Sequence, residues 1–335
     1  MDITDFENED EYAERMLAEK KLLNPRVDST FKALFTQPTA ESRGALKSFL
    51  EAATEHEIMK IELLPSSAII DYFGQRDVNY DILCTFNDGE QANIEMQAFN
   101  QCYNYGKRAE YHVAKVFASS LKKGMPWETV SKAYQISVLN FLYDSKSTDI
   151  VSRYAMRTAD GRELLNMQNI VFIELPKIKD KEKNFEKNTT LENWAIFLRD
   201  ADNPNKMDLI DELTKKEEGL MQAQQSLSSI SADKLMWVTQ FRQEVAEHDK
   251  ASYEYAIKKA RSDGLAEGRA EGRAKGLVEG RTEGRAKGLV EGRAEGVNNV
   301  MKLNALLIKE NRFDDLKRAS NDWDYLNKLL KDFNL

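Results

Sequence analysis

The sequence is poor in the two side chains that most often hold soft metals or crosslinks. Cysteine occurs twice in 335 residues, as Cys84 and Cys102, so neither a disulfide framework nor a cysteine-based zinc site is expected. Histidine occurs three times, as His56, His112 and His248, at positions that are far apart and lack the spacing of metal ligands. We therefore expect ordinary surface or core roles for the histidines.

Long apolar runs are also missing. No stretch approaches the about 20 apolar residues of a membrane-spanning helix, and the first residues lack a basic segment followed by an apolar one. We therefore expect a soluble, cytoplasmic protein with no membrane partner.

Positive charge is in deficit, since 48 Lys and Arg against 56 Asp and Glu give a net charge of −8. That balance argues against indiscriminate binding of nucleic acid but is compatible with a local basic rim around a site.

The spacing of apolar residues predicts both helices and strands. Helical periodicity begins at Asp28 and resumes after Thr39, and residues 58–73 are typical of extended or mixed structure. A helix is predicted at 103–123, with Gly124 as its C-terminal cap. Residues 190–260 are predicted to be mostly helical. Strands are predicted at 78–86, 91–97, 134–143 and 169–174, the third of them apolar enough for burial on both faces.

A short loop joins the predicted strands 78–86 and 91–97. Residues 87–89 are Asn-Asp-Gly, which predicts a type I turn closed by a left-handed glycine. A three-residue loop of this kind pairs Phe86 with Glu90. The loop therefore fixes the register of the hairpin.

That register brings three polar side chains together. Counting outward from the turn, Asp81 lies opposite Glu95, with about 5 Å between their Cβ atoms. Gln97 is two residues beyond Glu95 and points to the same face. A two-residue loop would shift the register by one and place the two acids on opposite faces.

Two carboxylates at this distance repel each other unless a cation lies between them. A hard divalent ion such as Mg²⁺ favours oxygen ligands, and it can polarise a phosphodiester and lower the pKa of a water. The Gln97 amide cannot act as a general base, but it can position a water or a phosphate oxygen. The plainer alternative is that Asp81 and Glu95 are ordinary acids on a half-exposed hairpin that faces water.

These residues resemble the PD-(D/E)XK nuclease superfamily, in which an acidic residue on one strand precedes a (D/E)-x-K segment on the next. More narrowly, the chain resembles the Rpn family of recombination-promoting nucleases and transposases. The Asn-Ile-Glu-Met-Gln run at 93–97 is the most specific of the matching pieces. These pieces, within roughly residues 20–295, are the D-x-x-F-K-x-x-F pattern at 28–35, residues 80–82 and 89–97, Arg108 with Tyr111, residues 174–177, Trp194 and a glycine-rich repeat.

The chain departs from the wider superfamily at two positions. No proline precedes Asp81, and Gln97 stands where the superfamily has lysine. Glutamine at this place is typical of the narrower Rpn family. The resemblance therefore leaves the identity of the general base open.

The resemblance implies an α/β fold. Its centre is a PD-(D/E)XK restriction-endonuclease-like core, in which helices flank a mixed sheet, and a helical C-terminal region follows. The expected organisation is an acidic N-terminal lead-in at 1–20, the nuclease-like domain at 21–200, a helical region at 201–262, a glycine-rich tetrad repeat at 263–296 and a C-terminal helical segment at 297–335.

The resemblance also implies roles at the site. Asp81 and Glu95 are expected to ligate Mg²⁺ or Mn²⁺, with the backbone carbonyl of Met96 as a further ligand. Gln97 is expected to orient water or phosphate. Asp28 is either an additional acidic residue of the site or the N-cap of the first helix of the core.

Two cations, Lys32 and Arg108, are expected to neutralise phosphate charge as a bond is cut. The alternative for each is a solvated surface side chain. Tyr111 is expected to pack rather than react, and Glu174 is expected to make a contact at the end of a strand.

Glycine recurs at every fourth position from 264 to 296, and a 12-residue unit that begins at Glu267 is repeated from Glu279 with a single change. Each interior glycine costs a helix about 1 kcal/mol relative to alanine, and most i,i+4 neighbours carry like charges. A lone helix is therefore expected to be unfavourable in water. Two interpretations remain: close packing against another helix, as in a homo-oligomer, or a mobile charged spacer.

The main hypothesis from these observations is a metal-dependent DNA endonuclease with little sequence specificity. Its role, by resemblance, belongs to recombination, mobile elements or defence. A second hypothesis is a catalytically inactive nuclease fold that serves as a DNA-binding or assembly module. A third is a protein that self-associates through its C-terminal repeat.

Overall fold

The computed structural model describes residues 6, 8–66, 78–99 and 104–335. Cys102, the segment 69–73 and much of the acidic opening lie outside the described residues. The chain divides into two units, Met1–Asp249 and Lys250–Leu335, and each is described by itself.

A mixed sheet of six strands, in the order β1-β2-β3-β4-β6-β5, forms the centre of the first unit as far as the described residues extend. The strands β1, β2 and β3 are antiparallel, β3, β4 and β6 are parallel, and β5 is antiparallel to β6. This is the mixed sheet that the resemblance implies. The strands are β1 (Ile61–Leu64), β2 (Ile82–Phe86), β3 (Glu90–Gln97), β4 (Ala133–Leu139), β5 (Val151–Ala155) and β6 (Gln168–Glu174).

The central strand β4 is buried at every residue and has a parallel neighbour on each side. That burial explains its nearly continuous apolar sequence and confirms the prediction for this segment. The edge strand β5 had no counterpart among the predicted strands. Its side chains are exposed or half-buried, and an edge strand of this kind lacks the apolar run that would reveal it.

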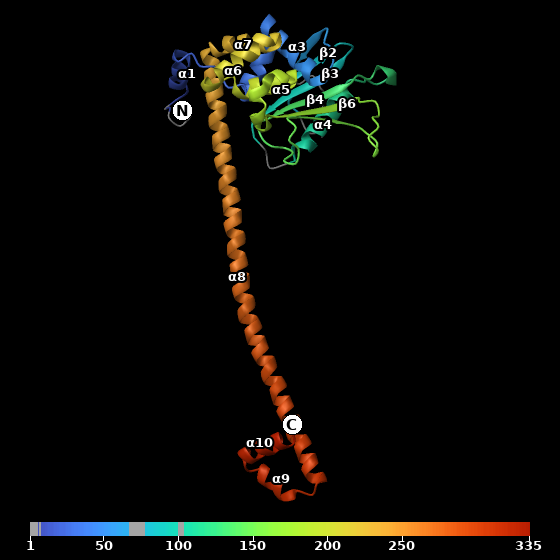
Figure 1. Cartoon of the computed structure of the whole chain (residues 1–335), viewed down its shortest axis with the longest axis vertical. Coiled ribbons are helices and arrows are strands. Elements are labelled where there is room, and N and C mark those ends of the chain that lie inside the picture. The colour runs from blue at the N-terminus through green and yellow to red at the C-terminus, as the bar shows by residue number, and fades with distance from the viewer. Residues whose placement is uncertain (1–5, 7, 67–77, 100–103) are drawn as a thin grey trace. The chain divides into compact units, whose positions relative to one another are not determined.

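Helices cover both faces of the sheet (Figure 1). On one face α4 packs over Leu83 and Phe172, whereas the other face carries the larger core, to which Ile82 and Phe86 belong. The two cores use alternate residues of β2, as the pleat of a strand requires. The helices of the first unit are α1 (Glu9–Ala18), α2 (Asp28–Thr36), α3 (Ala40–Thr54), α4 (Tyr105–Ser119), α5 (Thr190–Asp200), α6 (Met207–Lys216), α7 (Glu218–Ser231) and the start of α8 (Lys234–Lys309), with short 3-10 helices at Trp127–Thr129, Leu175–Asp180, Glu182–Lys187 and Pro204–Lys206.

Aromatic side chains hold the helices of the larger core together. Phe35 and Phe49, from α2 and α3, pack against the buried ring of Trp194 on α5, with ring centroids 5.7 Å and 5.4 Å away. The Trp194 indole also donates a hydrogen bond to Ser48 Oγ at 3.2 Å. Trp194 is therefore a packing residue that fixes α5 against α2 and α3.

The hairpin between β2 and β3 has the predicted register, because Phe86 pairs with Glu90 and Gly89 has a φ of +93°. The turn itself differs from a type I turn, since Asn87 also has a positive φ, of +47°. The Asn87 side chain accepts a hydrogen bond from Met59 N at 2.9 Å and donates one to Glu57 O at 2.9 Å. These two bonds to the segment before β1 hold Asn87 in the left-handed region.

The helix α4 ends earlier than the sequence predicts. Its last residue is Ser119, and Ser120 is the C-cap, with its N–H donating to Phe117 O. Gly124, which was predicted as the cap, has a φ of +89° and lies in a turn beyond the helix. The side chains of Ser119 and Ser120 bond to carbonyls of the last turn, so the helix is closed without a glycine.

The second unit is helical throughout. The helix α8 is followed by α9 (Phe313–Ala319) and α10 (Trp323–Asp332). The three elements share a small core of leucines and one alanine, namely Leu303, Leu307, Ala319, Leu326 and Leu329.

The glycine-rich repeat is part of α8, which differs from our expectation that a lone helix would be unfavourable there. Its side chains are exposed, and an added Cβ at any glycine from Gly264 to Gly296 would meet nothing within 4 Å. Most residues between the glycines are Ala, Leu, Glu, Arg or Lys, which are strong helix formers and offset part of the cost of glycine. Among the described residues, no helix combines the length and the apolar character needed to cross a membrane.

Candidate active site

Glu95 lies near the end of β3 and is fully buried. The side chains of Asn93, Glu95 and Gln97 share one face of β3, whereas Ile94 and Met96 point into the larger core on the other face. The polar face is the one that α4 covers. The strand therefore places three polar side chains beneath a single helix.

Three residues of α4 reach the Glu95 carboxylate. Tyr105 donates to Oε2 at 3.0 Å, Arg108 Nη2 lies 3.4 Å from Oε2, and His112 Nδ1 lies 2.7 Å from Oε1. Their spacing of three and four residues puts them on one face of the helix. The Nδ1 atom of His112 is the nearest of these three groups to the carboxylate.

The strand side of Glu95 is also polar. Asn93 Nδ2 donates to Glu95 Oε1 at 3.0 Å and to Gln135 Oε1 at 2.8 Å, and Gln135 Nε2 donates to Ser137 Oγ at 3.0 Å. Ser137 Oγ in turn lies 3.0 Å from the Tyr105 hydroxyl. Because Tyr105 has one hydroxyl proton and the carboxylate can only accept, the bond between serine and tyrosine must run from Ser137 to Tyr105.

The surroundings of Glu95 favour its charged form. Burial is the largest single influence and would raise the pKa of this carboxyl, but the favourable contacts, led by His112, together outweigh burial and hold the pKa below its usual range. The charge of Arg108 and the bond from Asn93 lower the pKa further. Glu95 is therefore an ionised acid inside the protein.

Asp81 directly precedes β2, and its carboxylate Oδ2 accepts a hydrogen bond from Met96 N at 3.3 Å. Burial, followed by the charges of Asp28 and Glu95, raises the pKa of Asp81 to about 8. The strand pairing begins one residue later, with Ile82 opposite Ile94. Continued by one residue, this register sets Asp81 opposite Glu95.

Asp28 is the first residue of α2, and Val27 occupies the N-cap position without a side-chain bond. The interpretation of Asp28 as an N-cap is therefore wrong. Its charge is instead the strongest of those acting on Asp81. The structure thus brings Asp28, Asp81 and Glu95 into one electrostatic group.

The other predicted residues of the site differ in position. Gln97 is buried at the end of β3, where it pairs with Leu139 of β4. Lys32 is exposed on α2, one turn beyond Asp28, and it forms no ion pair with Asp81 or Glu95 in the described part of the chain. Lys32 is therefore not a member of the buried cluster.

Arg108 and Tyr111 behave differently on α4. The Arg108 side chain, which was expected to meet phosphate, faces the Glu95 carboxylate in this structure and is 27% exposed. Tyr111 was expected to pack, but it is 40% exposed and has Lys115 Nζ 5.4 Å from its ring centroid.

Sequence reasoning missed His112 because its only neighbours in sequence are ordinary helix residues. The available signal was its position on α4, seven residues after Tyr105 and four after Arg108, which places all three on one face. The predictions also missed Asn93 and Gln135, which lie opposite each other on β3 and β4.

A second buried acid lies at the end of β6. Glu174 Oε2 accepts from the backbone N–H groups of Tyr143 and Asp144, at 2.7 Å and 3.2 Å. Its Oε1 accepts from Lys177 Nζ at 2.6 Å. Glu174 therefore makes the strand-end contact that was predicted for it, and it holds the loop after β4.

The atoms that Asp81 and Glu95 themselves offer to a metal are carboxylate oxygens, as a hard divalent cation prefers. Within the described ranges no group of three or more His, Cys, Asp or Glu side chains is arranged to hold a metal. Mg²⁺ does not require such a cage, since it is usually bound by one or two carboxylates together with waters and substrate phosphate. Burial, and then the charges of Asp28 and Glu95, raise the pKa of Asp81, and a bound cation would favour its charged form against both. On these grounds Asp81 and Glu95 fit a Mg²⁺ or Mn²⁺ ion.

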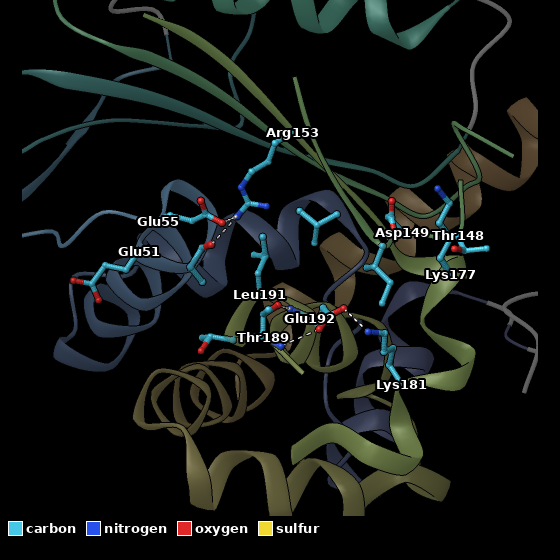
Figure 2. Close-up of a pocket in the computed structure, with 14 residues that line it drawn as sticks. Glu51, Glu55, Thr148, Asp149, Arg153, Lys177, Lys181, Thr189, Leu191 and Glu192 are labelled. Atoms are coloured by element: carbon cyan, nitrogen blue, oxygen red, sulfur yellow. Dashed lines mark hydrogen bonds and ion pairs between the residues drawn. The ribbon is translucent and has the colours of Figure 1, made fainter. Parts of the chain in front are cut away.

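A pocket of about 620 Å³ lies elsewhere in the first unit, between α3, β5 and the start of α5 (Figure 2). Its cations are paired: Arg153 binds Glu55 at 3.1 Å, and Lys181 binds Glu192 at 2.8 Å. None of Asp28, Asp81 and Glu95 lines it. The pocket is therefore separate from the carboxylate group.

Comparison with known proteins gives one match. Residues 25–256 match the model of the PD-(D/E)XK nuclease family transposases, which is well over half of the chain and includes every residue of the carboxylate group. Neither a curated protein nor a solved structure matches. The sheet order, the helices on both faces and this match lead to one conclusion: the chain belongs to the PD-(D/E)XK nuclease family transposases.

Proposed function

We propose that this protein is a metal-dependent DNA endonuclease that hydrolyses phosphodiester bonds with little sequence specificity. The observation that carries the proposal is the convergence of Asp28, Asp81 and Glu95 at the β2–β3 hairpin of a chain that belongs to a nuclease family. Recombination, mobile-element or defence biology is the setting that we propose for this activity.

Asp81 and Glu95 would hold the ion, Mg²⁺ or Mn²⁺, and the carbonyl of Met96 would add a backbone oxygen. When bound, such an ion polarises the phosphodiester and lowers the pKa of a water. Glu95 is suited to this role because its environment keeps it ionised. Asp81 is suited because its charge, at present opposed by burial and by Asp28, is stabilised by a cation.

Gln97 orients the water or a phosphate oxygen in this proposal. An amide takes up no proton at neutral pH, so the residue contributes position and not basicity. Its place on the same face of β3 as Glu95 supports this role. Asp28 adds a negative charge beside Asp81 and strengthens the attraction of a cation.

DNA is the substrate that the charge of α4 favours. Across Tyr105–Ser119 the helix carries Lys107, Arg108 and Lys115 against Glu110, a net charge of 3 − 1 = +2 in a chain of net charge −8. Lys107 is exposed on the helix that carries Arg108. Contacts of this kind attract the phosphate backbone whatever the base sequence, which accounts for the low specificity that we propose.

The test is nicking of a supercoiled plasmid by the full chain with Mg²⁺, with Mn²⁺ and with a chelator. We expect cleavage with either ion, none with the chelator, and a loss of about 10²- to 10³-fold in Asp81→Asn or Glu95→Gln. Glu55→Gln is the matched control, because Glu55 is a distant acid of the same unit whose side chain is 70% exposed. Undiminished cleavage in both site variants would refute the assignment.

A second candidate function is a nuclease fold that binds DNA without cutting it. The observation in its favour is that the Glu95 carboxylate is wholly buried and already bonded by side chains. DNA retention in a gel-shift assay, with neither metal binding nor cleavage, would favour this second function over the first.

A further inference from the structure

Four side chains surround the Glu95 carboxylate, two at each oxygen. A carboxylate offers about four lone-pair directions, two on each oxygen. Asn93 donates a hydrogen bond to Oε1 and Tyr105 donates one to Oε2, while His112 Nδ1 lies at ion-pair distance from Oε1 and Arg108 Nη2 from Oε2. A cation that binds Glu95 must therefore displace one of these four groups.

The four groups differ in how easily they can leave. Asn93 is fully buried and is tied to Gln135 as well, and Tyr105 is 4% exposed and is tied to Ser137. The side chain of His112 is 7% exposed and lies only 2.7 Å from its oxygen. Each of these departures would leave a buried polar group without its partner, which is costly.

Arg108 differs from the other three groups in the length of its contact with Glu95 and in its exposure to water. Its contact with Glu95 is the longest, at 3.4 Å, and its side chain is 27% exposed on a long, flexible stem. It carries a fixed positive charge, which a divalent cation at Glu95 would repel. Because its side chain is partly exposed and its stem is flexible, Arg108 can move toward water more easily than the other three groups.

We propose that Arg108 is a displaceable counter-ion of Glu95, which gives up its place to the divalent cation and then binds a phosphate of the nucleic acid. The inference rests on the proposed function and adds an order of events to it. Without metal, the guanidinium balances the Glu95 charge. With metal, the same guanidinium becomes available at the edge of the site, where planar, bidentate contacts to phosphate suit it.

This exchange couples two binding events. The cation must compete with Arg108 for Glu95, so metal binding in the absence of DNA is weaker than the carboxylates alone would give. Phosphate stabilises the displaced guanidinium, so DNA strengthens metal binding, and by linkage metal strengthens DNA binding by the same factor. Couplings of this type amount to about 5- to 100-fold.

The deciding experiment measures metal affinity without DNA. Mn²⁺ is titrated by calorimetry into the full chain and into Arg108→Gln, Arg108→Lys and the control Lys107→Gln. We expect Arg108→Gln to bind Mn²⁺ about 5- to 10-fold more tightly than the wild type, since the competitor is gone. Arg108→Lys, which keeps the charge, should stay near the wild type, and so should Lys107→Gln, because Lys107 makes no ion pair with Glu95.

A second measurement tests the coupling. The Kd for a short DNA duplex is measured with and without Ca²⁺, under conditions in which no cleavage occurs. The wild type should bind DNA more tightly with the cation, and Arg108→Gln should lose most of that gain. Thermal melting without metal verifies that each variant is folded.

Two outcomes would overturn the inference, and they are distinguishable. If the wild type binds Mn²⁺ and cuts DNA, but Arg108→Gln binds Mn²⁺ no more tightly, the exchange is wrong and the proposed function stands. If neither the wild type nor any folded variant binds Mn²⁺, and none cuts DNA, the proposed function fails and the exchange fails with it.

Discussion

Glu95 and Glu174 are both fully buried, and both lie at or near the ends of parallel strands of one sheet, yet their partners are of different kinds. Glu174 is bonded by two backbone N–H groups and by Lys177, a buried amine. Glu95 is bonded by side chains alone, and one of them, Arg108, reaches water. Backbone partners cannot leave without moving the chain, whereas side chains can.

In the function that we propose, this difference separates Glu174, which holds the fold, from Glu95, which binds a metal. The charged neighbours of the two acids also differ. Glu95 lies beside the carboxyl groups of Asp81 and Asp28, whereas Glu174 has the cation Lys177 as its neighbour. Burial alone therefore does not identify a functional acid. The kind of partner and the sign of the nearby charges are the observations that favour Glu95 in our proposal.

The largest expected effect sharpens this contrast through activity. Glu95→Gln keeps the shape of the side chain and removes its charge, so cleavage of plasmid DNA should fall by about 10²- to 10³-fold. Glu174→Gln, measured in the same nicking assay and corrected for the folded fraction, should cleave like the wild type. Equal losses in the two variants would remove the distinction between the acids.

The same pair should show the reverse order in stability. Glu174→Gln leaves the Lys177 amine buried without its counter-ion, so the free energy of unfolding should drop by about 3 kcal/mol. The measurement is urea unfolding at pH 7 followed by circular dichroism. Glu95→Gln should lose less, because Arg108 can turn to water. A larger loss in Glu95→Gln than in Glu174→Gln would contradict the comparison.

Asp81 provides a smaller effect of opposite sign. Its pKa of about 8 lies above that of a free carboxyl, so the folded chain binds the proton more tightly than the unfolded chain does. Stability from this group is therefore full below a pH of about 4 and is lost as the pH rises to about 8. Asp81→Asn should raise the free energy of unfolding above pH 8, without metal, by about 1–2 kcal/mol.

Thermal melting from pH 5 to pH 9 tests this prediction. The melting temperature of the wild type should fall relative to that of Asp81→Asn as the pH increases. Added Mg²⁺ should stabilise the wild type and leave Asp81→Asn nearly unchanged, since the variant lacks a ligand. Parallel melting curves for the two proteins across this range would show that Asp81 ionises normally.

The smallest expected effect concerns DNA binding by the exposed lysines beside Glu95 and beside Glu174. Lys107 is exposed on α4, next to the contact of Arg108 with Glu95, and Lys181 is exposed in the segment that follows Lys177. Lys107→Gln should weaken binding of a DNA duplex and lower the slope of log Kd against log salt by about 1. Lys181→Gln should leave both unchanged. A fluorescence-anisotropy titration at several salt concentrations decides.

What could be predicted from the sequence depended on local geometry. The loop 87–89 determines the register of the hairpin by its length, so the face of Glu95 followed from counting, even though the dihedral angles of Asn87 did not. The apolar run of β4 likewise predicted that this strand is buried on both faces. Resemblance added the family, and the most specific of the matching pieces, residues 93–97, lies within this same hairpin.

What could not be predicted depends on how distant segments meet. His112 belongs to the site only because α4 crosses over β3, and no local spacing encodes that crossing. Asn93 and Gln135 bond because β3 and β4 are parallel neighbours, which involves residues 42 apart. The N-cap of α2 was also not predictable. It is Val27 and not Asp28, because the backbone enters the helix one residue earlier than the sequence pattern indicated.

The tetrad spacing of glycine in α8 has a geometric consequence of its own. Four residues advance a helix by about 400°, so each glycine is rotated by about 40° from the one before it. A straight rod laid along α8 would therefore meet only two or three successive glycines before the column turned away from it. The glycines from Gly264 to Gly296 therefore wind around the axis of α8 and do not form a straight line along one face of it.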